Sequence, residues 1–346
     1  MEKYIANIEN PKVSIAPMVD KTHKHFRYFS RIMDKDILLY TEMVTAQSII
    51  HGDRDKILSF NKEEGKVALQ IAASNSEDAY KAVKLSEDYD YSEINLNCGC
   101  PSDRVSGNLM GAALMSSKDL VYEILTAMKE ATNKPITIKH RIGIDGTGII
   151  TDKNSKVIME GYEDLLEFLD TVSKAKPDRY TIHARSAILK GLSPKENRQI
   201  PKLDYDMVYK LKREFNYLNI EINGGFKTVE EIKSALDKVD SVMIGRVAYE
   251  DSYVLANLFK LNKYLENNKV KSRGEIIKEY LPYVQRELEK GSNVHNLIFP
   301  LQSLFHGQRG SGKYKQLLSS SSVKKDNAIE LIDSIFEIMP EDILWN

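Results

Sequence analysis

Cysteine is scarce: the 346 residues contain only Cys98 and Cys100, separated by Gly99. At this spacing the two are poorly placed to bond to each other, which excludes a disulfide framework and favours a reducing, cytoplasmic compartment. No cluster of His and Cys accompanies them, so we expect no metal site. No apolar run approaches the roughly 20 residues of a membrane span. The N-terminal residues lack the apolar core of a signal peptide, so no membrane association is expected.

Excess charge of either sign is also missing, because the formal net charge is −1. No overall field therefore favours nucleic acid. The charge is nevertheless uneven: residues 269–325 carry 11 Lys and Arg against 4 Asp and Glu, whereas residues 326–346 carry 6 acidic and no basic residues. The basic stretch fits a polyanionic partner, although ordinary solvated helix faces would give the same composition.

An early G-x-G-x-x-G motif is absent, which disfavours the alternative of a doubly wound, dinucleotide-binding sheet. Short apolar, β-branched runs instead alternate with helical patterns such as Lys118–Ala131 and Asp204–Glu214. Eight strands are expected, at Val13–Pro17, Leu38–Met43, Val67–Ala72, Glu93–Gly99, Ile136–Gly143, Tyr180–Arg185, Ile220–Gly225 and Ser241–Gly245. Eight such βα units in about 260 residues predict a closed (β/α)8 TIM barrel.

The strand pattern stops after about residue 263. Amphipathic helices are expected at Arg273–Lys290, Val294–His306 and Asp326–Met339, the first two interrupted by prolines. We therefore expect a catalytic barrel over residues 1–262 and a small C-terminal all-helical domain over residues 263–346.

Cys100 follows an alternating run, Glu93–Cys98, which is typical of a buried strand. Gly99 and Pro101 end that strand, because glycine frees the backbone and proline fixes φ and removes a donor. A polar loop at residues 103–108 comes next. Cys100 should thus stand at the carboxyl end of a strand, where parallel α/β folds place their chemistry. Taken alone, it could equally be a buried structural cysteine.

Polar residues and glycines collect where the expected strands end. They are Gln70, Lys139, His183, Asn223, Gly224, Gly225, Gly245 and Arg246. Each has an ordinary structural explanation, but a closed barrel brings them to one mouth, where glycines after the last two strands form a phosphate cradle. One phosphate site favours a mononucleotide. Gln70 and Lys139 suit a ring with carbonyl groups, so flavin mononucleotide (FMN) is the expected cofactor.

Cys100 can act as a general acid at this mouth. A free thiol has a pKa of about 8.5, so most of it is protonated at pH 7. Hydride from a reduced flavin to one carbon of a conjugated C=C bond, with a proton from Cys100 to the other, is a reduction. A nucleophilic cysteine would need an adjacent base, for which His183 is the only plausible candidate.

Seven segments of the chain resemble the tRNA-dihydrouridine synthases, and specifically the A-type subgroup that acts at positions 20 and 20a of tRNA. These segments are IAPMVD (15–20), LLYTEMVTAQSIIHG (38–52), EINLNCGCPSDRV (93–105), KHRIGID (139–145), IHARSAILKGLSPKENRQIP (182–201), INGG (222–225) and VMIGRVAY (242–249). They span most of the expected barrel, and GLSPKENR is specific to the subgroup.

The resemblance implies a set of roles. FMN would be bound by Pro17, Met18, Val19, Gln70, Lys139, His183, Asn223, Gly224, Gly225, Gly245 and Arg246. Cys100 would give a proton to uracil C5 while hydride goes from the flavin to C6, and NADPH (or NADH) would reduce the flavin first. The D-loop of tRNA would be contacted by Asn97, Lys195, Arg198, Lys313 and Lys315. No obligate protein partner is expected.

Three features depart from the family pattern. Cys98 stands where the family has an apolar residue, and we expect it to be a small core hydrophobe. The loop 146–161 is long and lies on the active-site face, as either a lid or an inert insertion. The C-terminal basic motif, Arg309–Lys315, has glycine and lysine where arginines are usual; lysine keeps the charge but loses the bidentate fork.

Two other functions remain open from the sequence. A flavin barrel acting on a small pyrimidine-like metabolite would explain the strand ends but leaves the basic helical region without a role. An RNA-binding module that keeps a flavin site only as structure is the non-enzymatic alternative.

Overall fold

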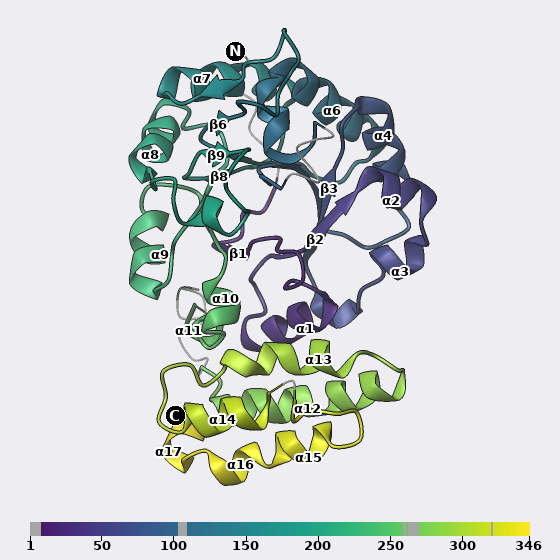
Figure 1. The fold of residues 1–346 in the computed structure, drawn as a ribbon, viewed down its shortest axis with the longest axis vertical. Coiled ribbons are helices and arrows are strands. Elements are labelled where there is room, and N and C mark those ends of the chain that lie inside the picture. Colours follow the sequence, from purple (N-terminus) through teal and green to yellow (C-terminus); the bar gives the residue numbers. More distant parts are fainter. Residues whose placement is uncertain (1–7, 103–108, 259–260, 262–269, 320) are drawn as a thin grey trace.

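The computed structural model describes residues 8–102, 109–258, 261, 270–319 and 321–346. Its centre is an eight-stranded parallel sheet in the order β1-β11-β10-β8-β5-β4-β3-β2, surrounded by helices (Figure 1). The two end strands meet through a parallel bridge between Ser14 and Leu38, where the N–H of Ile15 donates to the Leu38 carbonyl at 2.9 Å. This bridge closes the sheet, so the predicted (β/α)8 barrel is confirmed.

Each barrel strand lies within two residues of its expected bounds. The strands are β1 (Val13–Ile15), β2 (Leu39–Thr45), β3 (Val67–Ala72), β4 (Glu93–Cys98), β5 (Ile136–Arg141), β8 (Tyr180–His183), β10 (Ile220–Asn223) and β11 (Ser241–Ile244). Most end earlier than expected at the carboxyl side. In β10 the reason is backbone geometry, since Gly224 and Gly225 have φ angles of 127° and 77° and leave the extended region.

The helices around the barrel are mostly short. They are α1 (Lys24–Met33), α2 (Ala46–His51), α3 (Arg54–Leu58), α4 (Ser76–Leu85), α6 (Lys118–Ala131), α7 (Tyr162–Val172), α8 (Tyr205–Glu214), α9 (Val229–Leu236), α10 (Val247–Glu250) and α11 (Val254–Leu258). The expected bounds of α6 are reproduced at both ends. Asp204 caps α8 by accepting the N–H of Met207, which is the usual role of aspartate before a first helical turn.

The two faces of the barrel strands differ in character. The outward face packs on the helices as a large apolar core, to which Ile94, Leu96 and Cys98 of β4 belong. The inward face holds a small apolar cluster of Ala16, Leu38, Tyr40, Ala68 and Met243. Beside that cluster lie buried polar side chains, namely Glu93, Asn95, Asn97, Thr137, Arg179, Thr181 and Glu221. The barrel interior is therefore built as much from hydrogen bonds as from apolar packing.

A layer of helices below the barrel in Figure 1 forms the C-terminal part of the chain. It contains α12 (Arg273–Glu289), α13 (Val294–Ile298), α14 (Ser311–Leu317), α15 (Ala328–Asp333), α16 (Ile335–Ile338) and α17 (Glu341–Leu344). Two expected helices are each broken in two: a 3-10 turn begins at Phe299 next to Pro300, and α15 ends before Ser334. The expected boundary between residues 262 and 263 adjoins residues 262–269, outside the described residues, and the division into domains stays a prediction.

The helical layer is attached to the barrel through α1. Tyr28 of α1 stacks on Tyr283 of α12 with ring centroids 3.7 Å apart, and Phe29 packs edge-on against Tyr280 at 4.9 Å. The ammonium of Lys24 lies 3.2 Å from the carboxylate of Glu287. Because α1 directly follows β1, this attachment sets the helical layer beside the segment that leaves the first strand of the barrel.

The long loop at residues 146–161 is pinned rather than free. It is flanked by β6 (Ile144–Asp145) and carries β7 (Ile158–Met159) near its end. In a small second sheet, β6 pairs with β7 on one side and with β9 (Ala187–Ile188) on the other. The N–H of Lys156 donates to the Ser116 carbonyl at 3.0 Å. Whether this segment acts as a lid stays a prediction. Among the described helices, none combines the length and the apolar character that crossing a bilayer requires.

Candidate active site

Cys100 and Cys98 occupy different environments although only Gly99 separates them. Cys98 is buried in the helix-facing core, and burial raises the pKa of its thiol. It is thus the small core hydrophobe that we expected. Cys100 is only partly buried and lies just past the carboxyl end of β4. Both cysteines are free thiols, and of the two only Cys100 lies at the barrel mouth.

The backbone around Cys100 is held by two interior side chains. The Asn97 amide oxygen accepts the N–H groups of Gly99 at 3.1 Å and of Cys100 at 3.0 Å. From the neighbouring strand β5, Arg141 Nε donates to the Gly99 carbonyl at 2.9 Å. The Cys100 carbonyl in turn accepts the N–H of Ala112 at 2.9 Å. This turn is therefore fixed by hydrogen bonds on both of its sides.

Arg141 joins three loops of the mouth through one guanidinium group. Besides the Gly99 carbonyl, its Nη1 donates to the carbonyls of Ser186 at 2.9 Å and Asn197 at 3.2 Å. Asn197 is itself fully buried, and its side chain brackets the backbone N–H and carbonyl of Ile188 in β9. Arg141 thereby ties the cysteine turn to the turn that carries Lys195 and Arg198.

Lys139 and Asn223 meet across the mouth. Lys139 Nζ donates to the Asn223 amide oxygen at 3.1 Å, and the Asn223 amide nitrogen donates to the Met243 carbonyl at 2.8 Å. Burial, and next the nearby charge of Arg141, lower the pKa of Lys139 to about 8. A buried cation of this kind is stabilised when a ligand brings electron-rich oxygen or negative charge beside it.

His183 stands among these cations. Its pKa is held well below the ordinary value first by burial and then by Arg141, Lys139, Arg185 and Arg198. The imidazole is therefore neutral at pH 7. A neutral His183 surrounded by positive charge is a poor base for making a thiolate, which weighs against the nucleophilic alternative for Cys100.

Glycines open the mouth at the ends of β10 and β11. A Cβ added to Gly224 would lie 2.9 Å from both the His183 ring and the Leu203 side chain, whereas nothing lies within 4 Å of the corresponding position at Gly245. Gly225 and Arg246 complete this edge, and Arg246 is partly buried where α10 begins. Open space next to an arginine fits the phosphate that the sequence predicts here.

The remaining predicted residues fall into three groups. Pro17 and Met18 are partly buried beyond β1, and Val19 is exposed. Gln70 and Asn97 lie in the barrel interior, bonded to each other at 2.7 Å. Lys195, Arg198, Lys313 and Lys315 are exposed, the last two on α14. The polar loop at residues 103–108 lies outside the described residues. The contacts predicted for all of these side chains stay predictions.

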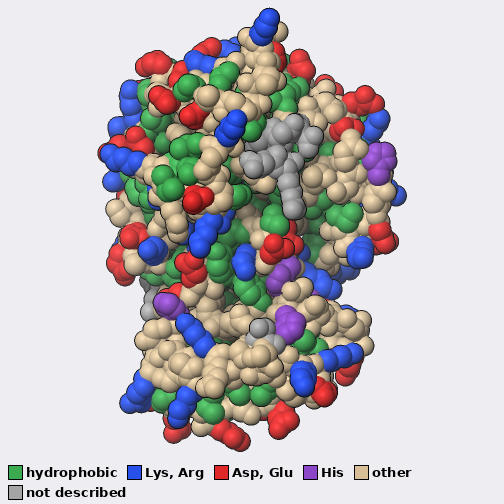
Figure 2. Space-filling view, in the orientation of Figure 1, with side chains coloured by type: hydrophobic (Ala, Val, Ile, Leu, Met, Phe, Trp, Pro, Cys, Tyr) green, Lys and Arg blue, Asp and Glu red, His purple; other side chains and the backbone are tan. Residues whose placement is uncertain are grey.

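Arg309, in the C-terminal basic motif, pairs with an acidic residue of the last helix. Its guanidinium lies 2.8 Å from the carboxylate of Asp342, and both side chains are exposed. Basic and histidine side chains lie along the waist where the barrel meets the helical layer in Figure 2.

Arg141 and Asn95 were not among the predicted site residues, yet both are central to the geometry. The alternation of β4 contained the signal: the apolar positions share one face, so Glu93, Asn95 and Asn97 must share the other. Three polar residues on the inner face of a barrel strand indicate an interior hydrogen-bond network. For Arg141, the sequence gave no sign that it would bind carbonyls of other loops.

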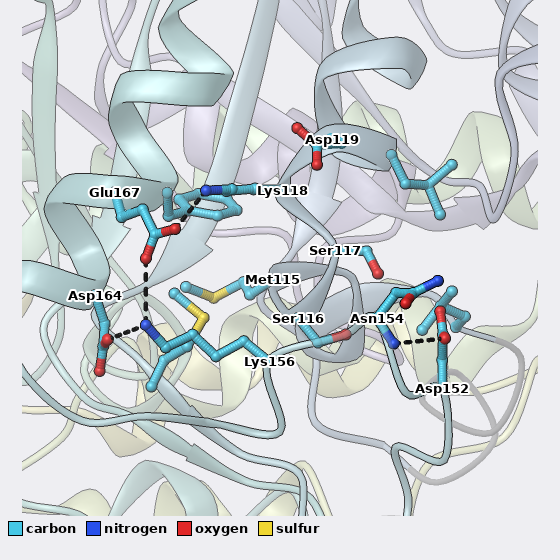
Figure 3. A pocket seen from close by; sticks show the side chains of 14 residues that line it. Met115, Ser116, Ser117, Lys118, Asp119, Asp152, Asn154, Lys156, Asp164 and Glu167 are labelled. Carbon is cyan, nitrogen blue, oxygen red and sulfur yellow. Dashed lines mark hydrogen bonds and ion pairs between the residues drawn. The ribbon is translucent and has the colours of Figure 1, made fainter.

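A separate cavity of about 360 Å³ lies between the long loop, the start of α6 and α7. In Figure 3 the Lys156 side chain extends toward Asp164 and Glu167, and Lys118 pairs with Glu167 from the other side. None of the predicted flavin residues lines this cavity. Both lysines among the described lining residues are already paired with carboxylates, so the cavity offers no unpaired positive charge for an anionic ligand. Among the described residues, no group of His, Cys, Asp or Glu is arranged to hold a metal ion.

Comparison with known proteins identifies the family. The model of the family described as dihydrouridine synthase matches residues 14–339. The chain belongs to the dihydrouridine synthase family. Proteins named tRNA-dihydrouridine(20/20a) synthase are among its relatives: one from Synechocystis is 44% identical over 97% of each chain. One from Vibrio parahaemolyticus is 44% identical over 96% of this chain and 98% of that protein. One from Pseudomonas putida is 39% identical over 95% of this chain and 94% of that protein.

Proposed function

We propose that this protein is a tRNA-dihydrouridine synthase that reduces the C5=C6 bond of uridines 20 and 20a in the tRNA D-loop. Two observations support the substrate: the printed names of relatives that match nearly the whole chain, and exposed basic residues on the mouth and on α14. The observation that carries the reaction is Cys100, a partly exposed thiol whose backbone is locked at the mouth by Asn97.

The residues of the mouth fit an FMN group. The open edge at Gly245, with Gly224, Gly225 and Arg246, would receive its phosphate, and Lys139, His183, Asn223 and Gln70 would surround its ring system. Pro17, Met18 and Val19 would lie along its other side. When bound and reduced by NADPH (or NADH), FMN supplies hydride to C6 of the uracil.

The protein's own contribution to the chemistry is proton delivery and positioning. Cys100 would donate the proton from its thiol to C5 as charge develops there. Asn97 and Arg141 keep the backbone of the Cys100 turn in place, so the backbone that carries the thiol need not be ordered during the reaction. The cationic surroundings of Lys139 and Arg141 would stabilise negative charge that arises in the mouth.

Access to the target base requires that it leave the folded RNA. A uridine must be extruded to reach a barrel mouth, and a protein recognises such an RNA mostly through its shape and phosphates. Lys195 and Arg198, on the turn that Arg141 fixes, would hold the RNA next to the mouth. Lys313 and Lys315 would contact it from the helical layer. A tRNA substrate supports a cytoplasmic location for the protein.

Two matched cysteine variants test the proposal. Purified protein with FMN, NADPH and an unmodified tRNA transcript should yield dihydrouridine at positions 20 and 20a, measured by mass mapping of nuclease fragments. Cys100→Ala should keep FMN but lose at least about 100-fold in rate, as expected for removal of a general acid. Cys98→Ala should retain the rate, because that thiol faces the helices.

Other outcomes would point elsewhere. Equal rates in Cys100→Ala and the wild type would remove the proposed acid. Reduction of free uridine in preference to tRNA would favour a metabolite reductase. Bound tRNA with no NADPH oxidation would favour the RNA-binding alternative.

A further inference from the structure

A continuous line of buried side chains runs from the floor of the barrel to Cys100. It starts at Glu93, the first residue of β4, and passes through Thr137, Asn95, Gln70 and Asn97. Each of these side chains is at most 6% exposed. Water therefore has little access to the line, and each polar atom depends on its neighbour for a hydrogen bond.

The lower end of the line can only accept. Arg179 donates to the Glu93 carboxylate, and the Tyr40 hydroxyl donates to it at 3.0 Å. Burial opposes the charge of Arg179, but its surroundings, chiefly Glu93, outweigh burial and raise its pKa well above the ordinary value. The Glu93 carboxylate oxygen thus acts as an acceptor toward both of these donors.

The acceptor role of Glu93 fixes the donor-to-acceptor direction of each following hydrogen bond in the line. The Thr137 hydroxyl has one proton, which it donates to Glu93 at 3.2 Å, so it must accept from the Asn95 amide nitrogen at 2.9 Å. The Asn95 oxygen is thereby turned toward Gln70, whose amide nitrogen donates to it at 2.8 Å. The Gln70 oxygen accepts from the Asn97 amide nitrogen at 2.7 Å.

The upper end can only donate, and it agrees with the lower end. The Asn97 oxygen accepts two backbone N–H groups, those of Gly99 and Cys100. Reversing any one amide in the line would place two donors or two acceptors face to face. A buried mismatch of this type costs about 1–3 kcal/mol. The line is thus fixed from both ends.

We propose that this one-way line of hydrogen bonds makes Glu93, Thr137 and Asn95 positioning residues for the active site. This inference rests on the proposed function. The three residues would set which edge of the Gln70 amide faces the pyrimidine part of the FMN ring system, and they would hold the Cys100 turn. Beyond its bonds to Asn95 and Asn97, the Gln70 amide would present its second N–H and its oxygen side by side in one orientation. That pattern matches a ring edge on which a carbonyl adjoins an N–H.

Thr137→Val tests the line with little change of volume, and Thr137→Ser is its control because it keeps the hydroxyl. In Thr137→Val the Asn95 amide nitrogen loses its acceptor. The substitution removes two hydrogen bonds of the line, those of Thr137 with Glu93 and with Asn95, and leaves one donor of the line without an acceptor wherever the defect settles. Amide hydrogen exchange at Gly99 and Cys100, measured on the flavin-free protein, should speed up about tenfold in the valine variant. It should stay near the wild-type rate in the serine variant.

Two further measurements separate positioning from general destabilisation. FMN should bind about fivefold more weakly to Thr137→Val, corresponding to one lost hydrogen bond, and the valine variant should lower kcat with an unchanged KM for tRNA. Equal exchange rates, FMN affinity and kcat in the valine and serine variants would overturn the proposal. Failure of the wild type to make dihydrouridine would refute the proposed function but would leave the exchange result as a test of the line itself.

Discussion

The two faces of β4 are both buried, but one is apolar and the other is polar. Its outward side chains, Ile94, Leu96 and Cys98, are buried among the helices and contribute apolar area. Its inward side chains, Glu93, Asn95 and Asn97, are equally buried but satisfied by specific hydrogen bonds. Apolar packing tolerates exchange among residues of similar volume, whereas buried polar groups do not tolerate the loss of a partner. The outer face thus provides stability, and the inner face provides orientation.

The largest expected effect compares matched substitutions to methionine on the two faces. Arg179→Met keeps a long side chain but leaves the Glu93 and Glu221 carboxylates without their cation. Removing one partner of a buried pair costs about 3–5 kcal/mol. Leu96→Met, on the outer face, should cost less than about 1.5 kcal/mol. Urea unfolding followed by circular dichroism measures both free energies, and similar losses would mean that the two faces do not differ as argued.

A second, smaller effect concerns the inner face near the mouth and depends on pH. The pKa of Lys139 in the ligand-free protein is about 8, so the ammonium is charged below that pH and neutral above it. If its charge helps to hold FMN, the affinity should change little as the pH rises to 7 and should fall about fivefold between pH 8 and 9. Quenching of flavin fluorescence on binding gives the affinity.

Lys139→Met supplies the control for this pH dependence. The variant should bind FMN weakly at every pH and show no step near pH 8. A step that persists in the variant would assign the titration to another group.

The third effect is at the attachment of the helical layer, far from either face of β4. Burial opposes ionisation of Glu287, but hydrogen bonds from Lys290 and Lys24 outweigh it and lower its pKa from 4.5 to about 2. The associated stability is present above pH 4.5 and lost as the pH falls toward 2. Glu287→Gln should cost about 1–2 kcal/mol at pH 7, allowing for screening of the exposed lysines, and less at pH 3.

An exposed ion pair on α4 is the reference for this measurement. Glu77→Gln removes the partner of Lys81, and a fully exposed pair of this kind should contribute little to stability. Thermal melts of both variants at pH 7 and pH 3 would show the contrast. An equal and small loss in both would mean that Glu287 does not secure the layer.

The smallest effect is expected on the surface around the mouth. The logarithm of the tRNA binding constant should fall linearly with the logarithm of the salt concentration. Lys195→Ala and Arg198→Ala should each reduce the slope of that line by about one if each side chain contacts one phosphate. Lys174→Ala, in the turn that follows α7 and away from the barrel mouth, should leave the slope unchanged. Filter binding at several salt concentrations measures these slopes, and equal slopes in all variants would exclude the proposed contacts.

Much of the fold could be predicted because the outward faces of the strands carry a simple signal. Alternating apolar residues such as Ile94 and Leu96 located the strands, and turn residues such as Gly99 and Gly224 located their ends. Helix breaks were harder, since Pro282 continues α12 whereas Pro300 begins a separate turn. Local sequence does not state whether neighbouring packing can compensate a proline.

The site was only partly predictable for a related reason. Residues such as Lys139 and Asn223 are found because strand ends converge in a barrel. The partners of Arg141 are backbone carbonyls of Gly99, Ser186 and Asn197, which carry no sequence signal. The order of hydrogen bonds through Thr137 and Asn95 likewise depends on the register between β4 and β5, which appears only in three dimensions.

The seam between β1 and β2 has the fewest paired residues of any side of the barrel. Strand β1 has three residues, and it meets β2 through the single Ser14–Leu38 bridge and the backbone bonds flanking it. Such a short seam should open more readily than any other side of the barrel. Pro17, Met18 and Val19 follow the carboxyl end of β1, so a cofactor bound by those residues would hold the end of this strand in place. Cofactor binding would then stabilise the closed barrel, and the cofactor-free protein would open locally between β1 and β2.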